Sequence, residues 1–341
     1  MALLEVKDLS TSFQTEDGIV RAVQGVNFSV EKGQTLGIVG ESGCGKSVTC
    51  LTIMGLNPKS KTISTGEALW KDKDLLTMKP SALRAIRGNE ISMIFQDPMT
   101  SLNPVHSIGR QLVEAILLHR DVSKKAARAR ALELLKAVGI PRAETRIDDY
   151  PHQFSGGMRQ RVMIAMALIN DPDLLIADEP TTALDVTTQA QILTLMKRLQ
   201  EEFGSAIMMI THDLGVVAEI SDDVLVMYAA NVVEQAPVSE LFNHPQHPYT
   251  WGLMGSLPRL ETDVERLTQI PGQPPSLLRP PAGCRFHPRC PYVMEVCKTT
   301  VPELEPAAGD STHLQKCHLD EATKEREAAK LLEVTMAAET G

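Results

Sequence analysis

The sequence predicts an α/β fold with a mostly parallel core sheet, an antiparallel β portion, a helical insertion and a C-terminal extension rich in proline and cysteine. Three observations support this. Short apolar runs alternate with helix-compatible segments up to about residue 240, prolines concentrate beyond it, and four of the 6 cysteines fall near the C-terminus. We expect a core at residues 1–240 with the insertion at about 97–165, a Pro/Cys-rich domain at 241–320, and a solvated helix or disordered tail at 321–341.

Composition and charge narrow the class of protein. With 341 residues, 43 % of them apolar, the chain can bury a proper core. Its formal net charge of −9 argues against a nucleic-acid partner held by a broad basic surface. The sequence has no apolar run of about 18 residues and no signal peptide at its N-terminus. We therefore expect a cytosolic protein that reaches a membrane only through partners.

The N-terminal part predicts short strands at Leu3–Val6, Val20–Val30 and Thr35–Val39. Phe13 lies in a polar stretch, Ser10–Gly18, that resembles a turn. An aromatic side chain there either stacks on an adenine ring or packs in a small satellite cluster, and the sequence favours neither.

The stretch Gly40–Ser47 fits the phosphate-loop pattern G-x-x-x-x-G-K-[ST], between a predicted strand and a helix-compatible segment, Lys46–Met54. Glycines let the backbone aim N–H groups at phosphate oxygens, Lys46 reaches the β- and γ-phosphates, and the hydroxyl of Ser47 binds Mg²⁺. The residues expected to bind ATP here are Gly40, Glu41, Ser42, Gly43, Cys44, Gly45, Lys46 and Ser47.

A further buried strand is expected at Ile91–Phe95, after a strand-and-turn excursion over residues 56–90. It ends at Gln96, whose amide is placed to touch Mg²⁺ or the attacking water, although a glutamine at a strand end is more often only solvated. From Ile108 to Gly139 the apolar spacing predicts helices, with the basic run Lys124–Arg130 on a solvated face.

A second candidate phosphate site is Ser155-Gly156-Gly157-Met158, which precedes a helix predicted at Val162–Leu168. Its exposed backbone N–H groups and the helix dipole suit an anion, although the same residues on their own form only a helix cap.

Two carboxylates end the apolar strand predicted at Leu174–Asp178. Asp178 suits a ligand of Mg²⁺ through its water shell, and Glu179 suits a general base that polarises the attacking water. Paired acids at a strand end can also be N-terminal helix charges, but the phosphate loop upstream favours the functional interpretation.

The core continues with a helix predicted at Val186–Phe203, a buried strand at Ala206–Ile210 and a hairpin of Val224–Tyr228 and Asn231–Val233. His212 follows the buried strand directly. It is placed to contact the γ-phosphate and hold the attacking water, or it is a structural histidine.

The region after residue 240 predicts a linker or irregular subdomain and not a continuation of the sheet. Its cysteines have the spacing C-x5-C-x6-C-x19-C: Cys284, Cys290, Cys297 and Cys317. A reducing compartment disfavours disulfides, and a segment with little apolar periodicity needs a crosslink to become ordered. Four thiolates suit an iron–sulfur cluster or zinc, for which His287, His313 and His318 are additional ligands.

In their joint order and spacing, these motifs resemble the ATP-binding-cassette family over roughly residues 3–240. Gly40–Ser47 resembles the Walker A motif, Phe154–Gln160 the signature motif, and Leu174–Asp178 the Walker B motif. The resemblance implies a P-loop NTPase core and makes Phe13 the adenine-stacking aromatic. The Q-loop glutamine, catalytic glutamate, D-loop aspartate and switch histidine correspond to Gln96, Glu179, Asp185 and His212.

A narrower resemblance, to the ATPase subunits of bacterial oligopeptide and dipeptide importers, comes from Ile94–Pro104, His247–Thr250 and the cysteine-bearing tail. It implies that the four tail cysteines bind a four-iron four-sulfur cluster, with zinc as the alternative. Close relatives in that group import nickel complexes, glutathione or oligosaccharides, so the solute stays open. A soluble DNA-associated ATPase is less consistent with the chain, because such proteins usually interrupt the cassette with long coiled coils or zinc modules. Here only 59 positions separate Gln96 from Ser155, with no sustained heptads.

The resemblance implies a complex at the cytoplasmic face of the inner or plasma membrane. This chain would pair with a paralogous ATPase subunit beneath two transmembrane permease subunits, with an extracytoplasmic solute-binding protein delivering the solute. Each ATP, with its Mg²⁺, would lie between the phosphate loop of one ATPase subunit and the Ser155–Met158 segment of the other. We therefore expect no nucleic-acid partner and slow hydrolysis by an isolated monomer.

Overall fold

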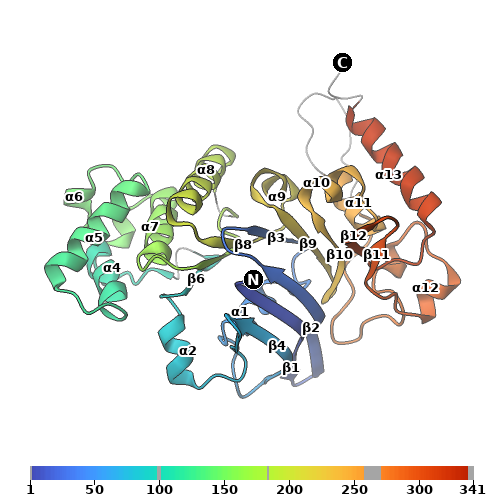
Figure 1. Ribbon diagram of the computed structural model, residues 1–341, viewed down its shortest axis with the longest axis horizontal. Helices are drawn as coiled ribbons and strands as arrows, with labels where there is room; N and C mark the ends of the chain where they lie inside the picture. Colours follow the sequence, from blue (N-terminus) through green and yellow to red (C-terminus); the bar gives the residue numbers. More distant parts are fainter. Residues whose placement is uncertain (1, 98–100, 183, 257–269, 337–341) are drawn as a thin grey trace. The chain divides into compact units, whose positions relative to one another are not determined.

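The structure is a computed structural model that describes residues 2–97, 101–182, 184–256 and 270–336 (Figure 1). Contacts along the chain divide it into two compact units. The first unit comprises Met1–Leu3, Val30–Thr35 and Thr77–Ile210, and the second comprises Leu4–Ser29, Leu36–Leu76 and Thr211–Gly341. Within the described ranges, no helix combines the length and apolar composition needed to cross a bilayer.

Three parallel strands form the sheet of the first unit. β7 (Leu174–Asp178) pairs with β6 (Ile91–Ile94) on one side and with β8 (Ala206–Thr211) on the other. Every residue of β7 and β8 is buried, so these strands have continuous apolar runs where a half-exposed strand would alternate. The predicted strands are confirmed at these places.

Helices make up most of the remainder of the first unit, and four of them, α4 to α7, drawn in green in Figure 1, lie in the region of the proposed insertion, whose bounds stay a prediction. The helices are α2 (Pro80–Ile86), α4 (Ile108–Leu117), α5 (Lys124–Ala137), α6 (Ala143–Arg146), α7 (Gly156–Leu168) and α8 (Val186–Phe203), with a 3-10 turn η1 (Pro151–Gln153). The prediction for α8 is confirmed. The strand-and-turn prediction over residues 56–90 missed α2, and α7 begins at Gly156, six residues before the predicted helix start at Val162.

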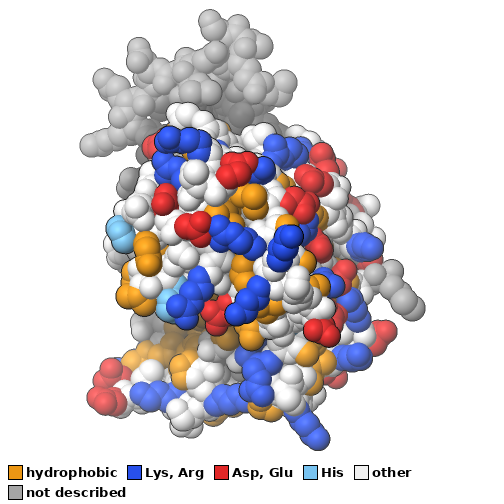
Figure 2. Space-filling model, turned by 90° about the vertical axis from the view of Figure 1, so that its left-hand side faces the viewer, with side chains coloured by type: hydrophobic (Ala, Val, Ile, Leu, Met, Phe, Trp, Pro, Cys, Tyr) orange, Lys and Arg blue, Asp and Glu red, His pale blue; other side chains and the backbone are white. Residues whose placement is uncertain are grey.

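Helix α5 carries the basic run, and the structure confirms that it is solvated. Lys124, Lys125 and Arg128 are exposed, whereas Ala127 and Ala131 are buried on the opposite face. Figure 2, turned so that the side with α4, α5 and α6 faces the viewer, shows basic and acidic side chains intermixed over this face. A surface of mixed charge is what a solvated helix requires.

An antiparallel sheet opens the second unit, in the order β2-β1-β4-β5. Its strands are β1 (Leu4–Thr15), β2 (Gly18–Val30), β4 (Thr62–Trp70) and β5 (Lys73–Asp74). The prediction of a turn at Ser10–Gly18 was wrong for most of its length, because β1 extends to Thr15 and β2 begins at Gly18. Phe13 pairs with Thr62 in β4. This end of β1 is partly exposed and polar, so the sequence lacks the apolar alternation that marks a strand.

The remaining strands of the second unit belong to a mixed sheet. β3 (Thr35–Val39) pairs in parallel with β9 (Asp223–Tyr228), and β10 (Asn231–Pro237) pairs with β9 as the predicted hairpin. The expectation that the C-terminal region does not continue the sheet was wrong. β12 (Asp310–Gln315) pairs antiparallel with β10, and β11 (Glu305–Ala307) pairs with β12.

Short helices connect these strands in the second unit: α1 (Lys46–Ile53), α9 (Leu214–Ile220), α10 (Val238–Asn243), α11 (Pro248–Gly255), a 3-10 turn η2 (His287–Arg289) and α12 (Glu295–Thr299). A helix at the end of the chain, α13 (Glu321–Met336), follows them, and residues 337–341 lie outside the described part. A buried cluster that includes Tyr228, Tyr249 and Phe286 joins β9, α11 and the cysteine-bearing loop. The boundaries proposed at residues 240 and 320 stay predictions.

Candidate functional site

The phosphate loop Gly40–Ser47 runs from β3 into α1, as the motif predicts. Lys46 is buried, and its ammonium group donates to the carbonyl oxygens of Gly40 (2.7 Å) and Glu41 (3.0 Å). The lysine therefore lies folded over the first turn of its own loop. Phosphate oxygens are acceptors of the same kind, so they can replace these carbonyls as partners of the ammonium group.

Two glycines of the loop are required by the backbone packed against them. A Cβ on Gly40 would lie 2.1 Å from the carbonyl oxygen of Met227 in β9, and a Cβ on Gly45 would lie 2.4 Å from that of Ala22 in β2. Gly45 also has a φ of 112°, which side chains rarely tolerate. Neighbouring strands thus fix the shape of the loop. Burial raises the pKa of the Cys44 thiol, which keeps it protonated within the loop.

Glu179 accepts hydrogen bonds from two other segments of the first unit. The side-chain nitrogen of Gln96 donates to its Oε2 at 3.0 Å, and the hydroxyl of Thr182 donates to the same oxygen at 2.8 Å. The sequence identified Gln96 and Glu179 but gave no sign that they touch. It missed Thr182, for which a hydroxyl three residues after the proposed base was the available signal.

The backbone of Glu179 is also constrained. Its φ is 47°, in the left-handed region that glycine favours, and its N–H donates to the carbonyl of Ile210 in β8 at 2.9 Å. Strained backbone of this kind collects at functional sites, because only a well-packed surrounding holds it. Asp178, the last residue of β7, is 5 % exposed, whereas Glu179 is only half-buried, so the two acids differ in environment.

The signature segment caps α7. The Ser155 side chain accepts from the backbone N–H of Met158 at 3.3 Å, as predicted for a helix cap. Gly156 is exposed, and a Cβ there would meet no atom of the described chain within 4 Å. Packing within the described chain therefore does not require a glycine at this place.

Three other predicted residues have simple local settings. Asp185 is the N-cap of α8 and accepts from the backbone N–H and hydroxyl of Thr188, which lowers the pKa of its carboxyl group. His212 is exposed directly after β8, and Phe13 is half-buried near the end of β1. Their predicted roles toward ATP stay predictions.

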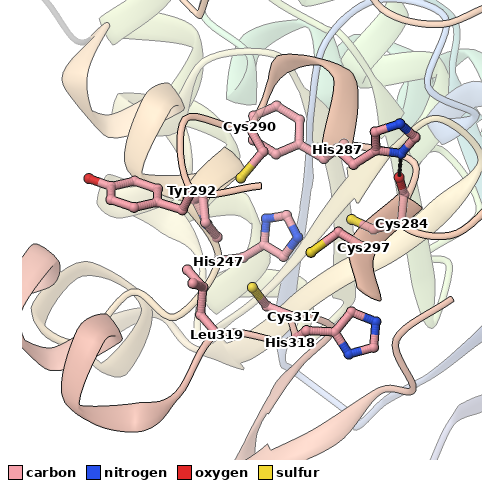
Figure 3. Close-up of a pocket in the computed structure, with 11 residues that line it drawn as sticks. His247, Cys284, His287, Cys290, Tyr292, Cys297, Cys317, His318 and Leu319 are labelled. Carbon is pink, nitrogen blue, oxygen red and sulfur yellow. Dashed lines mark hydrogen bonds between the residues drawn. The ribbon is translucent and has the colours of Figure 1, made fainter. Parts of the chain in front are cut away.

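The four C-terminal cysteines converge on one pocket in the second unit (Figure 3). They come from four segments: the loop at Cys284, the end of η2 at Cys290, α12 at Cys297 and the chain after β12 at Cys317. The pocket is otherwise lined mainly by rings and apolar groups, including His247, Phe286 and Tyr292. Sequence spacing predicted this convergence, but it did not predict His247.

Burial favours the protonated form of Cys284, Cys290 and Cys317. It raises the pKa of Cys290 to about 12 and of Cys317 to about 11, and it also raises the pKa of Cys284. All are free thiols. In the described part of the chain, no three or more His, Cys, Asp or Glu side chains are grouped closely enough to hold a single metal ion. Of the histidines suggested as zinc ligands, His313 instead bonds the carboxylate of Glu234 at 2.8 Å.

Family models match both parts of the chain. Residues 23–182 match the model described as ABC transporter, and residues 233–297 match the model described as Oligopeptide/dipeptide transporter, C-terminal region. The second match covers α11 and the first three of the four cysteines.

Curated relatives are similar over most of the chain. It is 57 % identical over 295 residues to the dipeptide transport ATP-binding protein DppD of Lactococcus lactis, covering 86 % of this chain and 84 % of that protein. It is 54 % identical over 301 residues to the oligopeptide transport ATP-binding protein OppD of Escherichia coli, covering 88 % of this chain and 89 % of that protein.

Among solved structures, a dimeric ATP-binding cassette in a post-hydrolysis state, bound to ADP and Pi, is similar with a TM-score of 0.62 and 29 % identity. The match covers 69 % of this chain and 98 % of that one. Nearly all of that cassette is therefore matched, by about two thirds of this chain. The chain belongs to the ATP-binding-cassette family, among the ATP-hydrolysing subunits of dipeptide and oligopeptide importers.

Proposed function

We propose that this chain hydrolyses ATP to drive import of dipeptides or oligopeptides, as a heterodimer with a paralogous ATPase subunit. The two would lie on the cytoplasmic face of the membrane beneath two permease subunits, with an extracytoplasmic binding protein supplying the solute. The observation that carries the proposal is the extent of the similarity, which continues past the ATPase core through residues 233–297. The alternative is that the same ATPase subunit drives import of a nickel complex, glutathione or an oligosaccharide.

Each of the site residues has its own role in the proposed hydrolysis of ATP. Lys46 and the N–H groups of the phosphate loop bind the triphosphate, and Glu179 accepts the proton of the water that attacks the γ-phosphorus. The bond from that phosphorus to the β–γ bridging oxygen breaks, which gives ADP and phosphate. Gln96 and Thr182 orient the carboxylate of Glu179 through the bonds described above. We assign His212 to the γ-phosphate and Phe13 to the adenine.

The residues proposed to bind Mg²⁺ fit its chemistry. Ser47, Gln96 and Asp178 offer hydroxyl, amide and carboxylate oxygens, which are the ligand types this ion prefers. When bound, the ion neutralises charge on the phosphate oxygens.

The signature segment acts on the partner's nucleotide in this proposal. Ser155 caps a helix of 13 residues that begins with Gly156, Gly157 and Met158, and the first N–H groups and the dipole of this helix favour an anion. The open space beside Gly156 supports a ligand from outside the chain. A related cassette is dimeric and holds ADP and Pi, which supports pairing of two such chains. Asp185 belongs to the same proposed interface.

We further propose that Cys284, Cys290, Cys297 and Cys317 bind a four-iron four-sulfur cluster. Four thiols from separate segments line one pocket, and each would bind a different iron. Zinc fits less well. A tetrahedral zinc ion with bonds of about 2.3 Å draws its ligands into one tight group, and the described residues contain no such group.

Groups around the pocket suit an anionic, sulfur-rich occupant. The Nε2 atom of His247 is buried without a hydrogen-bond partner. Its Nδ1 accepts from the N–H of Tyr249 at 3.0 Å, so the neutral ring carries its proton on Nε2. The backbone carbonyl of Lys316 favours the protonated form of the His247 ring, but it makes no hydrogen bond of regular geometry to Nε2. A cluster sulfur would accept the orphaned N–H. The buried Lys324, which also pairs with Glu321 at 3.1 Å, would offset part of the negative charge.

Purification of the assembled complex tests the transport proposal. A tagged chain recovered from its own membranes should bring down a second ATPase and two multi-span proteins. In proteoliposomes, the complex with its binding protein should hydrolyse ATP faster when dipeptides or oligopeptides are added. Stimulation by a nickel complex, glutathione or an oligosaccharide, and not by peptides, would assign the solute to the alternative.

Metal analysis of anaerobically purified chain tests the cluster. We expect brown absorbance, with iron and acid-labile sulfide each at about four per chain. Finding zinc without iron or sulfide would show that the cysteines bind zinc and not the cluster. A metal-free protein with full ATPase activity in the complex would contradict the proposal of a metal site.

A further inference from the structure

Glu41, the second residue of the phosphate loop, is held at three points. Its carboxylate accepts two hydrogen bonds from the guanidinium of Arg289, at 2.6 and 3.0 Å. Its N–H donates to the hydroxyl oxygen of Tyr249 at 2.8 Å, and its carbonyl accepts from Lys46 at 3.0 Å. Two of these three contacts come from residues that lie 208 and 248 positions later in the chain. The first turn of the loop is therefore fixed from outside the loop.

Arg289 is built into its place. Its side chain is 5 % exposed, and it also donates to the carbonyls of Ile270 (3.2 Å) and Pro271 (2.9 Å) and to the hydroxyl of Tyr228 (3.4 Å). Burial alone would lower the pKa of this guanidinium, but the bonds to Glu41 and Tyr228 and the charge of Glu41 raise it. A two-point guanidinium–carboxylate contact fixes orientation as well as distance.

Tyr249 is equally constrained. It is fully buried, and its ring lies 4.6 Å from that of Tyr228 and 5.5 Å from that of Phe286. Burial raises its pKa well above the ordinary value, so the hydroxyl stays neutral as a partner for the N–H of Glu41.

The two residues that contact Glu41 from outside the loop, Arg289 and Tyr249, lie next to residues of the cysteine pocket in the sequence. Arg289 is the last residue of η2 and directly precedes Cys290, and Tyr249 follows two residues after His247, which lines the same pocket. Phe286, another lining residue, packs on Tyr249. Two short routes, one through Arg289 and one through Tyr249, thus connect the cysteine-bearing region with the loop that cradles phosphate.

We propose that Arg289 and Tyr249 are positioning residues for ATP: they hold Glu41, and through it the cysteine-bearing region shapes the phosphate loop before nucleotide arrives. A loop already in its binding conformation pays less ordering entropy when the phosphates enter. The loop contacts the phosphates in the ground state and in the transition state alike, so loosening it weakens ATP binding more than it slows the chemical step. The inference needs only the ATPase activity and does not depend on which metal the cysteines bind.

Nucleotide binding and steady-state kinetics of three variants test this. Tyr249→Phe keeps the ring and its packing but removes the hydroxyl, Arg289→Gln removes the two-point contact, and Arg289→Lys restores the charge with a single point of attachment. For Arg289→Gln we expect the Kd of a non-hydrolysable ATP analogue on the full chain, and the KM of the assembled complex, to rise on the order of tenfold. The kcat should change by less than about threefold. Tyr249→Phe should shift Kd and KM in the same direction, and Arg289→Lys should lie between wild type and Arg289→Gln.

A matched control is Arg128→Gln. Arg128 makes the same two-point contact, to Asp148 at 2.9 and 2.7 Å, on an exposed surface of the first unit. The Arg128→Gln substitution should leave Kd and KM unchanged. A purely structural role for Arg289 would lower the amount of active protein without moving Kd. A folded Tyr249→Phe protein with wild-type Kd and KM overturns the proposal, even if Arg289→Gln fails to fold.

Discussion

Gln96 donates its side-chain N–H to the carboxylate of Glu179 over 3.0 Å, across 83 positions of sequence. The bond joins the end of β6 to the end of β7, which are neighbours in the parallel sheet. Parallel strands bring their carboxyl ends to one edge, so two polar residues that each follow a buried strand meet there. The contact holds the proposed base against the residue that we propose to touch Mg²⁺ or water.

Glu179→Gln should separate ATP binding from turnover. The amide keeps the size of the side chain but loses basicity, so the assembled complex should bind ATP with near wild-type affinity and hydrolyse it about 10²-fold more slowly or worse. Thr182→Val, which removes one bond to the same carboxylate, should have a smaller effect. Normal hydrolysis by the Glu179→Gln complex would contradict the assignment of the base.

Gly156→Asp tests the signature segment. An aspartate in the first turn of α7 is favourable for the helix, and the space beside Gly156 is open, so melting temperature should stay within a few degrees of wild type. A carboxylate there repels the partner's triphosphate, so turnover by the complex should fall by about 10²-fold. Lys124→Asp, at the equivalent place in α5, should leave turnover unchanged. Equal loss in both variants would argue against a specific phosphate site.

Replacing one cluster ligand should remove iron. Cys317→Ser and Cys290→Ser proteins, purified without oxygen, should lose most of their iron and sulfide. Cys50→Ala removes a fully buried thiol of α1 that does not line the pocket, so it should keep both. Iron retained in all three variants would show that the cysteines are not its ligands.

Stability should fall in acid because of His247. Burial, and next the charge of Lys324, lower its pKa from 6.5 to about 3. Between these values the unfolded chain binds a proton that the folded chain excludes, so this contribution is complete above pH 6.5 and is lost as the pH falls. The loss approaches about 1.4 kcal/mol per pH unit below that point.

Urea titrations of the full chain from pH 7.5 to 5 measure this loss of stability, because these pH values span the ordinary histidine pKa. His247→Asn retains an oxygen that can cap α11 but does not titrate. Its stability should depend less on pH than that of the wild type. Parallel pH profiles for the two proteins would exclude His247 as the cause.

Glu234→Gln should destabilise the second unit. The Glu234 carboxylate is fully buried and accepts from the N–H groups of Gln246 (2.6 Å) and His247 (3.0 Å), from His313 (2.8 Å) and from Thr250. An amide turns one acceptor into a donor that faces other donors, at a cost of about 3 kcal/mol in the free energy of unfolding. Glu133→Gln, which breaks an exposed pair with Arg130, should cost less than about 0.5 kcal/mol.

Most of the core could be predicted from local sequence patterns. The phosphate loop, α8 and the hairpin of β9 and β10 each have a signal confined to a few consecutive residues, namely a glycine pattern, an apolar period or a turn. Phe13 shows where this fails, because the polar end of β1 becomes a strand through its pairing with β4.

The contacts of Arg289 with Glu41 and of β12 with β10 could not be predicted for a related reason. Each joins short segments far apart in sequence, and neither segment has a period that marks it as paired. The four cysteines were assigned together because thiols are rare, but His247 and Tyr249 are ordinary residues whose role depends on what packs against them.

The pairing of β12 with β10 also sets an order of events during synthesis. Glu234 and Gln235 leave the ribosome well before their partners Gln315 and Leu314. In that interval the outer edge of β10 has unpaired N–H and C=O groups, and the carboxylate of Glu234 lacks the imidazole of His313. The nascent chain must therefore keep an open sheet edge away from other chains until β12 has been made.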